Sequence, residues 1–135
     1  MKATIRVLVV DDNKYLADVL CSALVLHEDI HIIGACNSGA EALEVLQRRQ
    51  VDVMLLDIIM PNMDGLQVLA HMSAGDMHKP AVILLTAIGN DEILQKASAL
   101  GADSFLTKPV TADVIVQRIR TVFKDRHPLS VETDV

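Results

Sequence analysis

Side chains that could do chemistry stand at the ends of the hydrophobic runs in this sequence. They are three carboxylates, one hydroxyl and one ammonium group, found at Asp11, Asp12, Asp57, Thr86 and Lys108. Carboxylates without His or Cys ligands beside them favour a hard cation, Mg²⁺ above all, with Mn²⁺ or Ca²⁺ as alternatives. An aspartate is also a competent nucleophile toward a phosphoryl group, for which Lys108 offers charge neutralisation and Thr86 a hydrogen-bond donor. These residues therefore predict Mg²⁺-assisted phosphoryl transfer, provided that the fold brings them together.

The elements that must position these groups alternate along the chain as short apolar runs and amphipathic segments. Strands are expected at about residues 6–10, 31–35, 51–56, 81–85 and 104–106. Helices are expected to begin at caps or turns at Asn13, Ser38, Gly65, Asp91 and Thr111. Runs such as VLVV and AVILL are apolar on both faces, as strands covered by helices on both sides require. The pattern predicts an α/β fold with a doubly wound parallel sheet, whose ligands bind beyond the carboxyl ends of the strands.

The bulk properties predict one soluble domain. The chain has 135 residues, a net charge of −6 and a pI near 5.2, which argues against direct binding of nucleic acid. No apolar run approaches the length that spans a bilayer, and no basic leader with a cleavage site precedes them, so we expect a cytoplasmic protein without membrane attachment. The segment 124–135 is polar and contains Pro128, which is typical of a tail or linker.

The reactive residues also resemble those of a known family. The motifs are Asp11-Asp12, the stretch DIIMPNMDG from Asp57, Thr86-Ala87 and Lys108-Pro109. Together, and at this spacing, they resemble the receiver domains of two-component response regulators over residues 4–124. The resemblance implies a flavodoxin-like receiver fold with five helices and a five-stranded sheet in the order 2-1-3-4-5. Residues 125–135 are then expected to be a polar tail, or the start of a linker to an effector domain.

The resemblance also implies a role for each acidic residue. Asp57 is expected to take a phosphoryl group from the phosphohistidine of a sensor histidine kinase or a histidine phosphotransferase. Asp12 and Asp57 are expected to bind Mg²⁺ directly, together with the backbone carbonyl of Ile59, while Asp11 acts largely through a bound water molecule. Such a protein is a signalling switch rather than an enzyme, because it catalyses only its own phosphorylation and slow dephosphorylation.

The switch itself is expected to involve three further residues. Lys108 would pair with the acyl phosphate, and its bond to Pro109 would be cis. Thr86 would move toward the phosphoryl group, and Phe105 would turn inward behind it. The resemblance places the output surface on the fourth helix, the fifth strand and the fifth helix, a face through which two phosphorylated copies could pair.

Within receivers, the sequence is most similar to those of the sporulation master regulators of endospore-forming bacteria. The matching stretches are VVDDN, LDIIMPNMDGL, LLTAIGND and KASALGADSFLTKP. This likeness implies control of transcription through a DNA-binding domain outside this sequence. The alternative is a stand-alone receiver that acts as a relay intermediate or a protein-interaction switch. Val110 departs from the family, which usually has an aromatic residue after Lys-Pro. Ile59 and Ile88 are apolar where a polar side chain could orient water, so we expect slow self-dephosphorylation.

Two other classes of protein fit less well. Haloacid-dehalogenase-like phosphotransferases need a second acid two residues after the nucleophile, where this chain has Ile59, and they carry a cap domain for which no residues remain. Flavin-binding modules of similar topology need a phosphate loop rich in Ser, Thr and Gly after the first strand. This chain has DDNK there.

Overall fold

The structure is a computed structural model that describes residues 4–76, 78–87 and 90–127. Its strands are β1 (Ile5–Val10), β2 (Ile30–Cys36), β3 (Val53–Asp57), β4 (Ala81–Thr86) and β5 (Ser104–Thr107). Its helices are α1 (Lys14–Leu24), α2 (Gly39–Arg48), α3 (Gly65–Ala74), α4 (Asp91–Ala99) and α5 (Ala112–Arg126). The strands pair in parallel in the order β2-β1-β3-β4-β5, which confirms the predicted fold.

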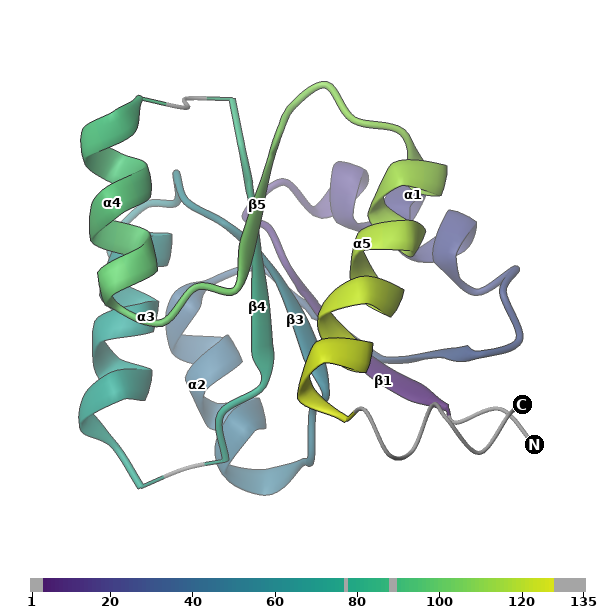
Figure 1. Cartoon of the computed structure of the whole chain (residues 1–135), viewed down its shortest axis with the longest axis horizontal. Helices are drawn as coiled ribbons and strands as arrows, with labels where there is room; N and C mark the ends of the chain where they lie inside the picture. Colours follow the sequence, from purple (N-terminus) through teal and green to yellow (C-terminus); the bar gives the residue numbers. More distant parts are fainter. Residues whose placement is uncertain (1–3, 77, 88–89, 128–135) are drawn as a thin grey trace.

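Helices cover both faces of the sheet, as Figure 1 shows. Alternate residues of each central strand point into two different cores. In β3, Val53 and Leu55 pack with α1 and α5, whereas Met54 and Leu56 pack with α2, α3 and α4. All four side chains are fully buried, which explains why the strand is apolar on both faces. The two cores fix the sheet, and so they fix the positions of the residues at its edge.

Side-chain caps begin the helices largely as predicted. Asn13, Ser38 and Thr111 accept hydrogen bonds from backbone N–H groups of the first turns of α1, α2 and α5. The prediction that Asp91 caps α4 was wrong. The cap is Asn90, whose side-chain oxygen accepts from the N–H of Ile93 at 2.9 Å. Asp91 instead occupies the first turn of α4, where its negative charge faces the positive end of the helix dipole.

The last helix is longer than the sequence pattern predicted. α5 continues to Arg126, although residues from 124 onward were expected to belong to a polar tail. Arg126 pairs with both oxygens of Asp103, at 3.1 Å each, and donates to the carbonyls of Lys79 and Pro80. These tertiary contacts stabilise the last turn of the helix, which its polar sequence does not reveal. Residues 128–135 of the predicted tail lie outside the described residues.

None of the helices in the described part of the chain is both long enough and apolar enough to cross a bilayer.

Candidate functional site

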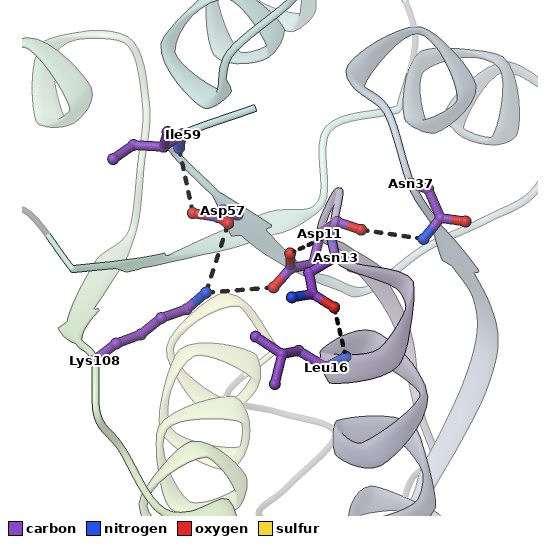
Figure 2. A network of polar contacts seen from close by, with 7 residues as sticks. All are labelled: Asp11, Asn13, Leu16, Asn37, Asp57, Ile59 and Lys108. Carbon is purple, nitrogen blue, oxygen red and sulfur yellow. Dashed lines mark hydrogen bonds and ion pairs between the residues drawn. The ribbon is translucent and has the colours of Figure 1, made fainter. Parts of the chain in front are cut away.

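The predicted reactive residues meet at the carboxyl edge of the sheet. The ends of β1, β3 and β5 and the segment after β4 border a cleft of about 320 Å³. The residues that line it include Asp11, Asp12, Asp57, Ile59, Ala87 and Lys108. Figure 2 shows Asp11, Asp57 and Lys108 pointing toward one another from three separate segments of the chain. The structure therefore brings together four of the five groups that the sequence singled out.

The three carboxylates form a compact cluster. Asp11, Asp12 and Asp57 each contribute one oxygen atom, and these atoms all lie within 4.8 Å of one another. Asp11 and Asp57 are buried, whereas Asp12 is exposed. The N–H of Asn13 donates to Asp11 at 2.9 Å, and the side chain of Asn37 donates to the backbone carbonyl of Asp11 at 3.1 Å. Three oxygen ligands without nitrogen or sulfur suit a hard divalent cation such as Mg²⁺, so the residues present fit the predicted metal.

Lys108 balances part of this negative charge. Its Nζ atom lies 3.3 Å from a carboxylate oxygen of Asp11 and 3.5 Å from one of Asp57. The other oxygen of Asp57 accepts a hydrogen bond from the N–H of Ile59 at 3.2 Å. Burial raises the pKa of the Asp57 carboxyl, with a smaller rise from Asp11, and the ammonium of Lys108 opposes both. Lys108 therefore balances the negative charge of Asp57 only in part, and a bound cation would further stabilise the ionised carboxylate.

The backbone around Lys108 places its ammonium in the cleft. The residue follows β5, its N–H donates to the carbonyl of Thr86 at 2.8 Å, and its bond to Pro109 is cis, as the family resemblance implied. Thr86 itself is buried at the end of β4, and Ala87 rather than Thr86 lines the cleft. Phe105 is 40% exposed on β5. Neither predicted switch residue is therefore among the residues that line the cleft.

Gly65 has a role at this site that the sequence did not reveal. A Cβ atom on Gly65 would lie 2.6 Å from the carbonyl oxygen of Asp57 and 2.8 Å from the Cα of Ile58. The N–H of Gly65 also donates to the carbonyl of Ile58 at 2.8 Å. The first turn of α3 therefore packs directly on the backbone at Asp57 and Ile58, a contact that only glycine permits. In the sequence, Gly65 signalled a turn and nothing more specific.

Two predictions about the cleft stay open. Ile59 borders the cleft with its side chain 51% exposed, and its N–H is bonded to Asp57, whereas the metal-binding role of its carbonyl stays a prediction. Ile88, the second residue expected to flank the route of attacking water, lies outside the described residues.

Asn37 was not singled out from the sequence, because a side-chain amide that supports a distant backbone carbonyl leaves no local pattern.

Comparisons with known proteins identify the family to which this chain is similar. The family model of the response regulator receiver domain matches residues 7–120. Among similar solved structures is the signal receiver domain of a response regulator named NarL from Mycobacterium tuberculosis. It has 34% sequence identity and a TM-score of 0.84, and the match covers 90% of this chain and 98% of that chain.

Two further structures resemble this chain. The receiver domain of the Francisella response regulator 1452 has 28% identity and a TM-score of 0.82, with coverage of 91% of this chain and 99% of that chain. The response regulator domain of CheB from Thermotoga maritima has 29% identity and a TM-score of 0.81, with 90% and 97% covered. The carboxylate cluster, the lysine beside it and the family match over most of the chain lead to one conclusion: this chain belongs to the response regulator receiver domain family.

Proposed function

We propose that Asp57 is the phosphoacceptor of a Mg²⁺-dependent signalling switch. The observation that carries this proposal is the shared contact of Lys108 with Asp11 and Asp57, within a cluster of three carboxylate oxygens. The phosphodonor would be the phosphohistidine of a sensor histidine kinase or a histidine phosphotransferase. A carboxylate oxygen of Asp57 would attack phosphorus, the phosphorus–nitrogen bond would break, and the imidazole nitrogen would take a proton.

The residues of the cleft would each meet one need of this reaction. Lys108 would turn from the carboxylates to the oxygens of the transferred group, because those oxygens then hold the greater negative charge. Asp12 and Asp57, with the carbonyl of Ile59, would hold the metal ion directly, and Asp11 through a water molecule. Bound Mg²⁺ would offset the negative charge that builds up on the transferring phosphoryl group. A similar structure from Borrelia burgdorferi, a complex of CheX and CheY, contains BeF3 and Mg²⁺.

Phosphorylation would then change the surface beside the cleft. Thr86 is buried at the end of β4, and a rotation of its side chain toward the phosphoryl oxygens would leave space behind it. Phe105 is half-exposed on the adjacent strand β5 and would turn inward to fill that space. The surface of α4, β5 and α5 would change shape as a result, and two phosphorylated copies could pair through it.

For the output, we propose control of transcription in the manner of the sporulation master regulators. The support is the likeness of four stretches of the sequence, VVDDN, LDIIMPNMDGL, LLTAIGND and KASALGADSFLTKP. The DNA-binding domain would lie outside this sequence, joined after a receiver domain at residues 4–124, and the protein would act in the cytoplasm. A stand-alone receiver that passes its phosphoryl group onward is the second candidate, because bulky Ile59 at the cleft favours a long-lived phosphoryl group.

The test of the phosphoacceptor proposal is the intact mass of the protein after incubation with acetyl phosphate, with and without Mg²⁺. One added phosphoryl group is expected in the wild type with Mg²⁺, and none in Asp57→Asn. Asp64→Asn is a matched control in the same loop. Asp64 caps α3 through its side chain, and asparagine caps equally well, so this variant should be phosphorylated normally. An adduct that survives Asp57→Asn would exclude Asp57 as the acceptor.

A further inference from the structure

The backbone of Asp11 is fixed on both sides by the end of β2. Its N–H donates to the carbonyl of Cys36 at 3.0 Å, and its own carbonyl accepts a hydrogen bond from the side-chain amide of Asn37 at 3.1 Å. Figure 2 shows this amide pointing toward the backbone of Asp11. The segment after β1 is therefore held in place by a residue that does not itself line the cleft.

The side chain of Asn37 takes the place of a backbone donor at this point. Val10 pairs with Cys36 at the ends of the parallel strands β1 and β2. If the ladder continued, the carbonyl of Asp11 would accept from the N–H of Ser38. Ser38 is instead the N-cap of α2, so β2 ends before it can supply that bond. The amide of Asn37 satisfies the carbonyl in its place.

The carbonyl of Asp11 belongs to the peptide bond between Asp11 and Asp12. Because a peptide unit is planar, the bond from Asn37 fixes the orientation of the whole unit that joins these two carboxylate residues. The side chain of Asp11 has two further contacts, with the N–H of Asn13 at 2.9 Å and with Lys108 at 3.3 Å. No described residue forms a hydrogen bond or an ion pair with the carboxylate of Asp12. The position of that carboxylate in the cluster thus depends chiefly on its backbone.

Asn37 is itself held by the first turn of α2. Its backbone N–H donates to Oε1 of Glu41 at 2.8 Å, and the N–H of Glu41 donates to the hydroxyl oxygen of Ser38 at 3.2 Å. This arrangement is a capping box displaced by one residue, since the glutamate of an ordinary box accepts from the N-cap and not from the residue before it. A continuous series of hydrogen bonds therefore connects α2 through Asn37 to the peptide of Asp11 and Asp12.

We infer that Asn37 is a positioning residue for the metal site, and that its side-chain amide sets the affinity for Mg²⁺ by orienting the peptide between Asp11 and Asp12. This inference rests on the proposed function and adds a residue that does not touch the ion. Without the amide, the peptide is free to rotate, and binding of Mg²⁺ must then order it. Loss of an outer hydrogen-bond partner of a metal ligand typically weakens metal binding by about tenfold or more.

The test measures Mg²⁺ binding by isothermal titration with MgCl₂ in the wild type, Asn37→Ala and Asn37→Leu. Leucine is similar to asparagine in size but has no hydrogen-bond donor. We expect both variants to bind Mg²⁺ about tenfold more weakly than the wild type does. Labelling by acetyl phosphate should be slower at low Mg²⁺ and return to the wild-type rate at saturating Mg²⁺, because the amide acts on the affinity for the ion and not on the transfer itself.

Ser38→Ala is the matched control. It removes the side-chain cap of α2 and should lower the urea midpoint of unfolding, but it leaves the bond from Asn37 to Asp11 in place, so Mg²⁺ affinity should equal that of the wild type. The inference is overturned if Asn37→Ala binds Mg²⁺ as tightly as the wild type, or if Ser38→Ala weakens binding to the same extent. Slow labelling of Asn37→Ala that persists at saturating Mg²⁺ would overturn it too. If Asn37→Leu fails to fold, Asn37→Ala decides the question, since the site is partly exposed.

Failure of the proposed function is recognised on the wild type alone. A wild type that acetyl phosphate does not label, although it binds Mg²⁺ more tightly than Asn37→Ala does, would overturn the role of Asp57 and support the inference. A wild type that binds no Mg²⁺ in the titration would overturn the metal-dependent function, and the inference with it.

Discussion

The ammonium of Lys108 lies 3.5 Å from a carboxylate oxygen of Asp57, although β4 separates β3, which ends at Asp57, from β5, which directly precedes Lys108. The contact exists because parallel strands end at one edge of the sheet and the backbone turns inward at Lys108. Asp57 also contributes one oxygen atom to the cluster that fits a cation. Lysine and metal ion therefore act on the same negative charge.

Replacement of Lys108 by Met should tighten Mg²⁺ binding while it slows phosphorylation. The ammonium repels a cation held by Asp11 and Asp57, and its removal should improve Mg²⁺ affinity by roughly threefold to tenfold, as for a partly exposed charge at this distance. Isothermal titration with MgCl₂ measures the affinity, and acetyl phosphate labelling measures the rate. Lys96→Met is the control, because Lys96 is an exposed lysine that pairs with Glu92 on α4. Weaker Mg²⁺ binding in Lys108→Met would contradict the competition.

Asp57 should destabilise the metal-free protein at neutral pH. Its pKa is raised by burial above the ordinary value of 3.8, so the folded protein binds this proton more tightly than the unfolded chain does. The contribution of Asp57 to the free energy of unfolding is therefore greatest below pH 3.8, where the carboxyl is protonated in both states. This contribution falls as the pH rises through the pKa of Asp57 in the folded protein. Asp57→Asn removes the charge and should raise the melting temperature at pH 7 by a few degrees.

Thermal unfolding without divalent cations, at pH 7 and near pH 4, measures this effect. The advantage of Asp57→Asn should shrink at the lower pH, and Mg²⁺ should stabilise the wild type but not the variant. Asp18→Asn, at an exposed position of α1, should match the wild type under all conditions. A variant that is less stable than the wild type at pH 7 would mean that the ion pair with Lys108 outweighs burial.

The sequence predicted the sheet well because the physics of its strands is local. A strand such as Val53–Asp57 must be apolar on both faces to lie between two layers of helices, and that pattern is visible in single residues.

The ends of helices were predicted less well. Asn90 and Asp91 are both good caps, and only the three-dimensional structure decides between them. Arg126 extends α5 through contacts with distant residues, which no local pattern contains.

The site was predicted to a similar degree and for a similar reason. Residues that end strands meet at one edge, so the positions of Asp11, Asp57 and Lys108 followed from topology. The buried position of Thr86 depends instead on the rotation of one side chain. The close approach of Gly65 to Asp57 depends on the path of the loop between them. Neither is encoded in the order of strands.

A chain that ends at Lys124 should be less stable than one that ends at His127. The shorter chain lacks Arg126 and its bonds to Asp103 and to the carbonyl of Lys79. Because this ion pair is bidentate but partly exposed, we expect its loss to lower the free energy of unfolding by about 1 to 2 kcal/mol. Urea unfolding of the two chains measures the difference. Arg126→Ala in the longer chain should reproduce most of the loss. Equal stability of all three proteins would show that the last turn of α5 contributes nothing.

Gly65→Ala should destabilise the protein and disturb the phosphoacceptor. The added Cβ would meet the carbonyl oxygen of Asp57 at 2.6 Å, and backbone atoms must move to accommodate it. We expect a cost of about 2 to 3 kcal/mol, together with slower labelling by acetyl phosphate. Gly34→Ala in β2 is the matched control, since a Cβ there meets nothing within 4 Å. It should leave both quantities close to those of the wild type. Equal effects of the two substitutions would contradict the special role of Gly65.

Ile59→Asn should shorten the lifetime of the phosphoryl group on Asp57. Ile59 is 51% exposed at the border of the cleft that holds Asp57, and its side chain offers no group that orients a water molecule. An amide at this position can hold the attacking water by a hydrogen bond. We therefore expect the phosphoryl group to be lost about tenfold faster, a gain that orientation of a reacting water can supply. The decay of the phosphorylated mass after removal of acetyl phosphate measures the rate. Ile59→Leu keeps an apolar side chain of equal size and should decay like the wild type. If the asparagine variant also decays at that rate, access of water is controlled elsewhere in the cleft.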